Sequence, residues 1–376
     1  MFLVMLGFGI IIPVMPFFAE ELGASPFQLG LLMASYSVMQ FLFAPMWGGI
    51  SDRIGRKPVI LIGISGLALS FFLFAVSDQL WMLFVSRILA GFLSSANMPT
   101  VMAYVADITS PENRGKGMGM IGASVGLGFI FGPAIGGIFS AESYSTPFFI
   151  AGFVSAITFL FVLFVLKESL PPEKRMKKGV AEPRWKAFSG SLSYLYVLMF
   201  FVTFSLSALE GTFAYFAADK AGLDTLHLGY IFMIMGLAGA FVQGGLVGRL
   251  IKKRGEGMVI QLGLLISAIG FALILLTNSF WTAALFLSIF GIGNGLIRPA
   301  VSALISKRTT VGQGAATGLL SSFESLGRIG GPPLGGAVYV LSINSPYIAG
   351  VILTVLAFVF YRIYVSRSGE TKAANA

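Results

Sequence analysis

The stretch of sequence that decides the fold is Gly48-Gly49-Ile50-Ser51-Asp52-Arg53-Ile54-Gly55-Arg56-Lys57, a short charged segment between two long apolar runs. Its glycines favour a tight turn and close packing of the helices on either side. Its acid and its bases stand at the ends of those helices, where they can pair with each other or cap a neighbouring helix. The segment therefore predicts a charged connection between two adjacent helices.

Long apolar runs of this kind fill the rest of the chain. Of its 376 residues, 56% are hydrophobic and only 11% are charged, and the mean hydropathy is +0.88. A soluble domain carries about 25% charged residues, so this chain lacks the charges to cover a water-exposed surface. The runs are too long, and alternate too little, for the roughly 10-residue strands of a membrane β-barrel. The composition predicts an all-α membrane protein with the lipid bilayer as its main partner.

The residue counts exclude several classes of site. The chain has no cysteine and one histidine, His227, so it cannot build a zinc cluster, an iron–sulfur ligand set, a cysteine nucleophile or a haem site with two histidines. We therefore expect no metal, no cofactor and no enzyme activity. The net charge of +9 lies in short clusters between the apolar runs, which indicates membrane topology rather than nucleic-acid binding.

A helix that spans a membrane needs roughly 20 apolar residues, and charges and turn residues divide the chain into twelve such segments. The predicted spans are 1–19, 27–50, 58–77, 79–106, 117–140, 146–166, 190–217, 226–248, 257–277, 280–306, 312–341 and 345–365. The first begins at Met1 without a basic flank, so we interpret it as a spanning helix that lacks its inner turn rather than as a cleaved signal peptide.

The basic residues give these spans a direction. Of the 25 lysines and arginines, 21 lie after even-numbered spans or at the C-terminal end, and one, Lys220, lies on the opposite side. Arg87, Arg298 and Arg328 lie inside spans. By the positive-inside rule, the even-numbered ends face the cytoplasm. We predict a multi-pass protein of the inner (plasma) membrane with a cytoplasmic C-terminus.

The long polar stretch at 167–189 divides the chain in two. It carries seven basic residues, three acidic residues and three prolines. This composition predicts a cytoplasmic linker between a half at 1–166 and a half at 190–368, with a tail at 369–376. The basic character is typical of topology and of contact with anionic lipid, and a site for a specific partner is the alternative.

Short motifs recur between the two halves at nearly one spacing. Gly132-Pro133-Ala134-Ile135-Gly136-Gly137 recurs 199 positions later as Gly331-Pro332-Pro333-Leu334-Gly335-Gly336, and Gly91 recurs 200 positions later as Gly291. Many transporters use repeated halves to build a central site that opens to alternate sides. The recurrence predicts two pseudo-symmetric halves of six helices each.

The segment at 48–57 strongly resembles the G-x-x-x-D-R-x-G-R-K signature of the major facilitator superfamily. Together with Pro13-Val14-Met15-Pro16, Arg87 and the glycine–proline motif at 128–137, it looks like the twelve-helix drug:proton antiporters of that superfamily, the bacterial multidrug and tetracycline pumps. The resemblance implies the major facilitator fold. It also implies a secondary active transporter that exports lipophilic or cationic drugs by alternating access, in exchange for protons.

The resemblance assigns two groups of residues to the conformational change. One group would hold the cytoplasmic side closed in the outward-facing state: Gly48, Asp52, Arg53, Gly55, Arg56, Lys57 and Asp107. The other is the motif associated with antiporters: Gly128, Gly132, Pro133, Gly136 and Gly137. Proline removes a backbone hydrogen bond and kinks a helix, while glycine lets a partner helix approach closely. The fifth span is therefore predicted to be a hinge, a packing seam or both.

Charged residues inside spans are costly in lipid, so each is a hypothesis about function. Arg87 resembles a family arginine with a part in proton transfer, and a structural arginine bonded to backbone carbonyls is the alternative. Glu210 resembles an acid in the binding cavity of Gram-positive multidrug pumps. A carboxylate there can attract a lipophilic cation or take up a proton, and a buried pair with an arginine is the alternative.

Two later spans carry further charges. Arg298 also resembles those pumps, but several of them have an aspartate three residues earlier, where this chain has Gly295 with Asn294 beside it. Their two-acid mechanism is therefore not carried over. Glu324 and Arg328 lie one helical turn apart and are predicted to pair, and the alternative makes Glu324 a second acid for proton coupling.

We expect proton coupling to involve Glu210, Arg87 and Glu324. Flexible methionine and phenylalanine walls suit promiscuous binding, although each such residue also suits plain helix packing. The predicted cavity residues are Glu210, Arg298, Asn294, Met98, Phe213 and Phe323. The expected partners are the lipid bilayer, a small-molecule substrate and protons, and the expected state is a monomer. An exporter or facilitator of a metabolite, sugar or lipid is the alternative on the same fold, and a membrane redox subunit is a more distant one.

Overall fold

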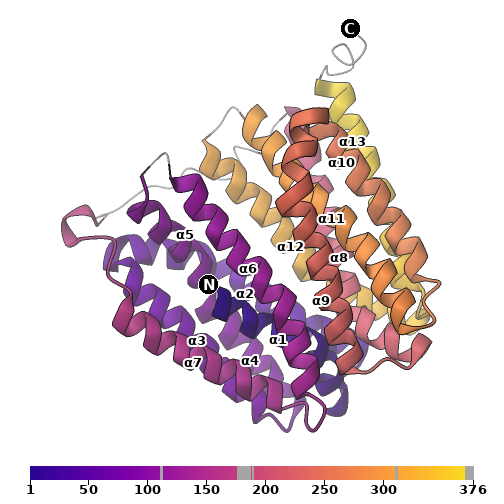
Figure 1. The fold of residues 1–376 in the computed structure, drawn as a ribbon, viewed down its shortest axis with the longest axis horizontal. Coiled ribbons are helices and arrows are strands. Elements are labelled where there is room, and N and C mark those ends of the chain that lie inside the picture. The colour runs from indigo at the N-terminus through magenta and orange to yellow at the C-terminus, as the bar shows by residue number, and fades with distance from the viewer. Residues whose placement is uncertain (111–112, 176–187, 189, 310–311, 369–376) are drawn as a thin grey trace. The chain divides into compact units, whose positions relative to one another are not determined.

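The structure is a computed structural model, and it describes residues 1–110, 113–175, 188, 190–309 and 312–368 (Figure 1). This part of the chain is almost entirely helical and contains no strand, which confirms the all-α prediction. Ten of its helical segments are long and apolar enough to cross a membrane. Most of the predicted linker and the whole predicted tail lie outside the described residues.

The chain divides into two compact units. Unit 1 comprises Met1–Val180 with Asp224–Met233, and unit 2 comprises Ala181–Leu223 with Ile234–Ala376. The helices of unit 1 are α1 (Phe2–Glu21), α2 (Pro26–Ile54), α3 (Arg56–Ala75), α4 (Leu80–Ser94), α5 (Asn97–Ile108), α6 (Arg114–Phe139), α7 (Thr146–Val165), a 3₁₀ turn (Pro172–Lys174) and the first part of α9 (Thr225–Phe241).

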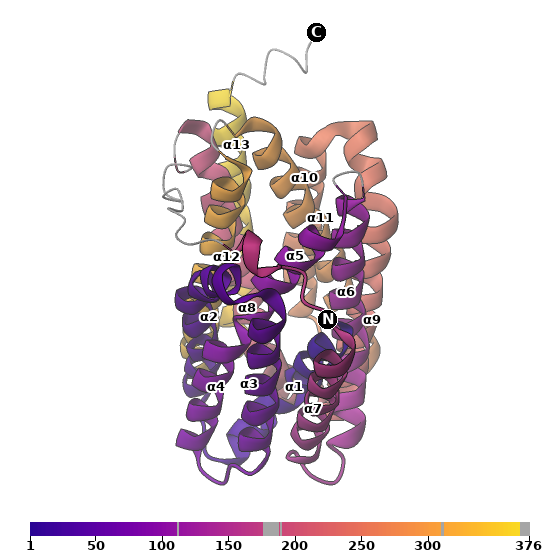
Figure 2. The same cartoon turned by 90° about the vertical axis from the view of Figure 1, so that its left-hand side faces the viewer.

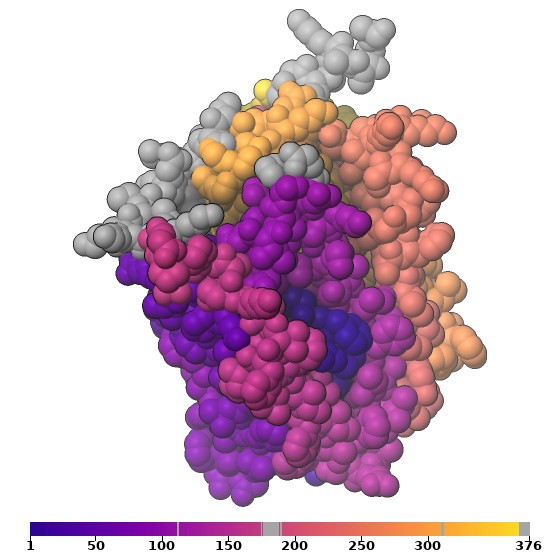
Figure 3. Space-filling view, turned by 60° about the vertical axis from the view of Figure 1, so that its left-hand side comes forward, coloured from indigo at the N-terminus to yellow at the C-terminus, as the bar shows by residue number. Residues whose placement is uncertain are grey.

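Within unit 1, α1 is largely buried. It packs against both α6 and α7, and its dark indigo surface is visible between them in Figure 3. The helix α3 packs against α4 and α7, and α2 packs against α4 (Figure 2). These neighbours bury most of α1, as expected for a helix that is apolar on all sides.

The ends of α2 follow from local sequence. Ser25 Oγ accepts a hydrogen bond from the N–H of Gln28, the Gln28 side chain accepts one from the N–H of Ser25, and Pro26 takes the first helical position. The helix ends at Gly55, whose φ of +110° favours glycine, and α3 begins at the next residue. The charged segment therefore lies on a tight α2–α3 turn.

The predicted span 79–106 corresponds to Leu80–Ile108, which is long and apolar enough to cross a membrane but consists of two helices. They are α4 and α5, which meet at Ser95 and Ala96. Pro99 gives a physical reason for the break, because it has no N–H for the carbonyl of Ser95 and its ring crowds that carbonyl.

Unit 2 has its own apolar core. Its helices are a 3₁₀ turn (Gly190–Leu192), α8 (Ser193–Ala221), the rest of α9, the π-helix η4 (Val242–Leu246), α10 (Val247–Ile274), α11 (Phe280–Arg308), α12 (Gln313–Leu341) and α13 (Ser345–Ser368). The helix α8 packs against α12 and α13, and α10 packs against α11 and α13. Buried side chains from all five of these helices form one cluster, which includes Leu195, Leu264 and Leu304.

The predicted spans 226–248 and 257–277 lie in two helices that meet at a kink. Helix runs from Thr225 through η4 to the kink and continues beyond it to Ile274. The interruption is one residue, Gly255, with a φ of +79°. The predicted span 312–341 is the helix α12, which is long enough to cross a membrane but too polar and glycine-rich to be among the ten apolar segments.

Candidate functional site

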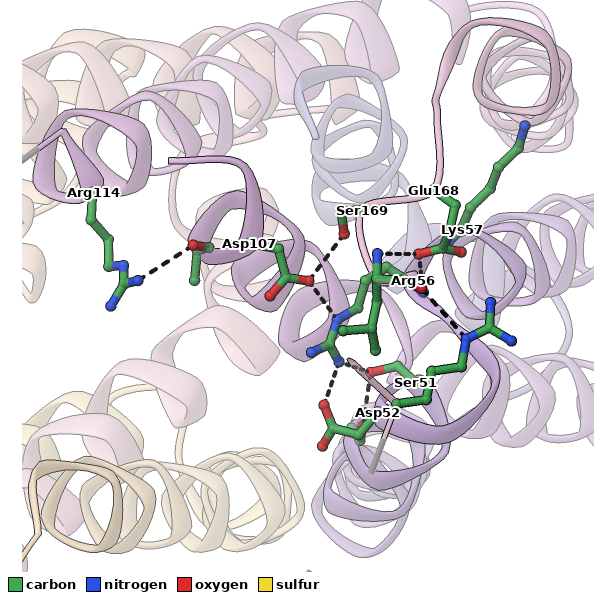
Figure 4. Close-up of polar contacts among 12 residues, drawn as sticks. Ser51, Asp52, Arg56, Lys57, Asp107, Arg114, Glu168 and Ser169 are labelled. Carbon is green, nitrogen blue, oxygen red and sulfur yellow. Dashed lines mark hydrogen bonds and ion pairs between the residues drawn. The ribbon is translucent and has the colours of Figure 1, made fainter. Parts of the chain in front are cut away.

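The α2–α3 turn of unit 1 holds an arginine between two acids (Figure 4). Arg56 Nη1 lies 2.5 Å from Asp52 Oδ1 and donates to Ser51 Oγ at 2.7 Å, and its Nε lies 3.0 Å from Asp107 Oδ2 on α5. Arg56 is 7% exposed, so the arginine end of these charge-assisted hydrogen bonds is buried, while the side chains of Asp52 and Asp107 are 39% and 23% exposed. The structure brings Asp52, Arg56 and Asp107 together as predicted, while their gating role remains a prediction.

Glu168, just after the end of α7, belongs to this cluster and was not predicted from the sequence. Its carboxylate accepts hydrogen bonds from the backbone N–H groups of Arg56 at 2.9 Å, Lys57 at 3.1 Å and Leu170 at 2.9 Å. The first N–H groups of a helix lack partners within it, so this acid caps α3. Partial burial disfavours the charged carboxylate, but these bonds and one from the Ser169 backbone outweigh it and hold the pKa of Glu168 below its ordinary value.

Lys57 makes the capping reciprocal. Its Nζ donates to the carbonyl of Leu163, in the last turn of α7, at 2.7 Å, where the helix dipole favours a cation. Glu168 thus caps the start of α3 from the end of α7, and Lys57 caps the end of α7 from the start of α3. A signal was present in the sequence, since both residues directly flank apolar runs on the predicted cytoplasmic side.

The glycines of the turn have different roles. Gly55 is required by its positive φ, and a Cβ there would also lie 2.5 Å from the Glu168 carboxylate. Gly48 and Gly49 lie inside α2, where a Cβ would meet nothing closer than 3.9 Å at Gly48 and nothing within 4 Å at Gly49. The prediction that these glycines allow close helix packing is therefore wrong for Gly48 and Gly49. Arg53 is exposed.

The predicted antiporter motif lines a close seam between α6 and α1. A Cβ at Gly128 would lie 2.5 Å from Met5 Cβ, and one at Gly132 would lie 2.6 Å from Gly9 Cα. Gly136 faces the backbone of α1 in the same way. The two helix backbones therefore approach as closely as glycine permits.

The C-terminal end of the same motif meets the start of α9. A Cβ at Gly137 would lie 2.7 Å from the carbonyl of Thr225, and Ser140 Oγ donates to Thr225 Oγ1 at 2.6 Å. The helix α6 continues through Pro133. The packing role is thus visible in the structure, and the hinge role of Pro133 remains a prediction.

In unit 2, Arg298 on α11 donates two parallel hydrogen bonds to the carboxylate of Glu324 on α12. Nε donates to Oε1 at 2.6 Å and Nη2 donates to Oε2 at 3.0 Å. The Glu324 side chain is 8% exposed and the Arg298 side chain is 64% exposed. The predicted pair between Glu324 and Arg328 is therefore wrong. The guanidinium fork of Arg298 matches both carboxylate oxygens, and spacing along one helix cannot reveal a partner on another.

Glu210 is partly buried on α8 and lies within the electrostatic reach of Arg328 on α12. No hydrogen bond or ion pair to its side chain occurs among the described residues. The helix α12 thus meets α11 through Glu324 and faces α8 with Arg328.

Arg87 lies on α4 of unit 1, with its guanidinium carbon 4.6 Å from the centre of the Tyr36 ring on α2. Its Nε is buried without a hydrogen-bond partner. Across the described ranges, Arg87 has no ion pair and no hydrogen bond to a backbone carbonyl. The alternative of a structural arginine bonded to carbonyls therefore finds no support in this geometry.

The remaining predicted cavity residues have different surroundings. Asn294 and Ser267 help to line a cavity of 10 Å³ in unit 2, which has room for about one water. Met98 is 38% exposed on α5. Phe213 is 0% exposed, which makes it a packing residue rather than a cavity wall, and Phe323 is partly buried against the core of unit 2.

Comparisons with known proteins cover the whole chain. It matches the family model described as Major Facilitator Superfamily at residues 1–310 and 244–376. It is 32% identical over its full length to multidrug resistance protein 2 of Bacillus subtilis, covering 95% of that protein, and 30% identical over its full length to quinolone resistance protein NorA of Staphylococcus aureus, covering 97%. The crystal structure of the human organic anion transporter MFSD10 matches it with a TM-score of 0.72 at 28% identity, with 96% of each chain covered.

Proposed function

The chain belongs to the major facilitator superfamily, and we propose that it is a proton-coupled exporter of lipophilic drugs, cationic ones included, that works by alternating access. It is a membrane transporter and not an enzyme. Two curated relatives are named as multidrug and quinolone resistance proteins, and these names support drug export as the transported class and direction.

The proposal of proton coupling rests mainly on Glu210. This acid lies deep in α8 and has no direct partner among the described residues. A carboxyl group inside a membrane protein is tolerated in a cavity or beside a cation. It holds a proton where its surroundings disfavour the charged form and releases it beside a cation. Proton and cationic substrate then compete for one negative site, and this competition is the exchange reaction. Because a ligand shifts a conformational equilibrium only by binding one state better, the same competition drives the transport cycle.

The cluster around Arg56 supports a gate on the cytoplasmic side. Its contacts join α2, α3, α5 and the end of α7 inside unit 1. We assign Asp52 and Arg56 to stabilising the outward-facing state, because charge-assisted hydrogen bonds of this kind hold helix ends in one arrangement. The reciprocal caps of Glu168 and Lys57 would keep the α3 and α7 ends together through the cycle.

Twelve spanning helices are the layout that we propose, in two halves at 1–166 and 190–368. The helical segment Thr225–Ile274 has 50 residues, which at 1.5 Å per residue is about 75 Å, more than twice the roughly 30 Å hydrocarbon core. It therefore has the length of two spans that meet at Gly255. The helix α12, with 29 residues, is the remaining span.

Two ion pairs at equivalent positions, one in each unit, support pseudo-symmetry between the halves. Arg56 pairs with Asp107 at 3.0 Å in unit 1, and Glu256 pairs with Lys307 at 3.4 Å in unit 2. Each member of the second pair lies 200 positions after its counterpart, close to the spacing of the glycine motifs, and the two charges are exchanged. Both units thus have an ion pair at equivalent positions, with the acid and the base exchanged. This equivalence supports two halves built on a common plan.

The proposed location is the plasma membrane, with the α2–α3 turn and the C-terminus in the cytoplasm and a monomer as the working state. Reporter fusions test this orientation. Fusions after Tyr364 are expected to read as cytoplasmic, and fusions near Asp78 and Asp219 as external. A reversed pattern at either outer position would contradict the twelve-span layout.

Transport by the purified chain in proteoliposomes tests the function. A pH gradient imposed across the membrane should drive uptake of lipophilic cationic dyes into vesicles that are acidic inside, and a protonophore should abolish it. Dye movement at the same rate with and without the gradient would contradict proton coupling. The second candidate is export of an organic anion or another metabolite. It is favoured by the human organic anion transporter among the matching structures, and organic anions added to the same vesicles distinguish it.

A further inference from the structure

Arg87 is the one charged residue in the interior of the helices that the structure describes for unit 1. It is the eighth residue of α4, about 10 Å along the helix from its start. The other charged residues of these helices lie in terminal turns: Glu20, Glu21, Asp52, Arg53, Arg56, Lys57, Asp107, Arg114 and Lys116. A cation at this depth is costly in lipid unless an anion or water compensates it.

The surroundings of Arg87 are aromatic rather than acidic. Its guanidinium lies over the Tyr36 ring, 4.6 Å from the centroid, and its Nε is buried without a partner. The Tyr36 hydroxyl is 3.1 Å from Ser94 Oγ on α4, and Phe8 of α1 meets the Tyr36 ring edge-on at 5.5 Å. These contacts fix the position of the Tyr36 ring beneath the guanidinium. None of the N–H groups of Arg87 is hydrogen-bonded to an acid among the described residues.

In unit 2, the charged residues in the interior of α8, α11 and α12 lie near charges of opposite sign. Arg298 and Glu324 form a direct pair, and Glu210 lies within the electrostatic reach of Arg328. Each deep acid of α8 and α12 therefore has a basic counterpart inside the unit. Among the described residues of unit 1, no acid pairs with Arg87, so the interior of this unit carries a positive charge that no described acid compensates.

We propose that Arg87 and the Tyr36 ring bind the carboxylate or sulfonate group of an amphiphilic substrate, which is an organic acid or a zwitterion. This proposal rests on the proposed transport function and specifies its substrate class. A guanidinium presents donors in a fixed fork that matches the two oxygens of such a group. A poorly compensated cation in apolar surroundings gains strongly from an incoming anion. The rings of Phe8 and Tyr36 then offer an apolar floor for the substrate body.

Three matched ligands isolate this interaction. The full chain in nanodiscs is dialysed to equilibrium against 1-pyrenebutyrate, its methyl ester or 1-pyrenebutylamine, and binding to empty nanodiscs is subtracted. The three share one aromatic body and differ in the head group. The variants are Arg87→Gln and Arg87→Lys, with Arg249→Gln as a control that removes a positive charge from an exposed position on α10.

Arg87→Gln is expected to weaken binding of pyrenebutyrate at least about tenfold, equivalent to 1.4 kcal/mol, and to change binding of the ester by less than about twofold. Arg249→Gln should leave all three affinities unchanged. If Arg87→Gln does not fold, Arg87→Lys carries the test. It keeps the charge and loses the fork, so it should weaken binding of the acid alone, by roughly threefold.

Equal weakening of acid and ester would show that Arg87 supports the fold and binds no anion. Unchanged binding of the acid by both Arg87→Gln and Arg87→Lys would also overturn the proposal. No pH gradient is used, so a failure of proton-driven transport leaves this binding test intact. A failure of the binding test would leave transport of cationic dyes intact.

Discussion

Arg298 on α11 donates from Nε and Nη2 to the two carboxylate oxygens of Glu324 on α12, at 2.6 and 3.0 Å. The two ends of this pair are in different surroundings, because the acid is 8% exposed and the arginine is 64% exposed. Loss of the arginine would leave a buried carboxylate without a partner. Loss of the acid would leave an arginine that is already largely exposed.

This asymmetry predicts that Arg298→Gln destabilises the protein more than Glu324→Gln does. We expect the first to lower the free energy of unfolding by roughly 2–3 kcal/mol and the second by about 1 kcal/mol. Unfolding in detergent at pH 7 measures both, and the double variant gives the coupling between them. Equal losses would mean that the two side chains share one environment.

Glu168→Gln is expected to destabilise the α3–α7 junction by about 1 kcal/mol at neutral pH, because the cap of α3 loses its charge. The carboxylate is largely exposed, which limits the effect. Since the folded pKa lies below the ordinary value of 4.5, the stabilisation is complete above that value and is lost as pH falls through the folded pKa.

Thermal unfolding between pH 7 and pH 3 tests this. The difference between unmodified chain and Glu168→Gln should be constant down to about pH 5 and shrink below the ordinary value. The control is Glu173→Gln, at an exposed residue of the neighbouring 3₁₀ turn. A difference that grows on acidification would contradict the capping role.

Asp52→Asn is expected to slow proton-driven efflux roughly tenfold, equivalent to about 1.4 kcal/mol in a state or barrier, with little loss of protein in the membrane. Arg56 would keep its contact to Asp107, so the turn should stay folded while the gate weakens. Glu142→Gln, an exposed acid in the loop after α6, is the control. Unchanged turnover would mean that the charged segment only orients the chain in the membrane.

Gly132→Ala is expected to lower the free energy of unfolding by roughly 1–3 kcal/mol, because the added methyl group would overlap the α1 backbone at Gly9. Gly126→Ala, on the same helix, is the matched control. A Cβ there meets nothing within 4 Å, and alanine favours helix over glycine. Equal effects of the two changes on unfolding in detergent would rule out a seam at Gly132.

Much of the fold followed from the apolar runs, because only helices and closed barrels satisfy their backbone in lipid, and runs of about 20 residues have the length of spanning helices. Each predicted span overlaps a helix of the structure. The misplaced boundaries have local causes. Pro99 breaks the fourth span, which hydropathy alone does not detect, and residues 249–256 stay helical apart from Gly255 although they are too polar to read as a span.

The site was predictable where its members are close in sequence and not where they are distant. Asp52 and Arg56 lie four residues apart on either side of the α2–α3 turn, and their contact is expected from the segment itself. Glu168 accepts a hydrogen bond from Arg56, which lies 112 positions earlier in the sequence. From the sequence, Glu168 is only one residue of the predicted basic linker. Glu324 had an arginine one turn away and a better one on α11, 26 positions away. Composition and spacing carry no information on which neighbouring helix supplies a partner.

Efflux by the Glu210→Gln variant is the most direct test of the central claim, that an acid on α8 exchanges protons for substrate. Glutamine mimics the protonated side chain and cannot release a proton. We expect Glu210→Gln to abolish pH-gradient-driven dye transport in proteoliposomes while the protein still folds and inserts, and Glu210→Asp to retain part of it, because the charge remains and the reach shortens. Glu324→Gln, whose acid is already held by Arg298, should still couple transport to the gradient. If Glu210→Gln transports dye under the gradient and Glu324→Gln does not, the proton site lies on α12 and the account is contradicted.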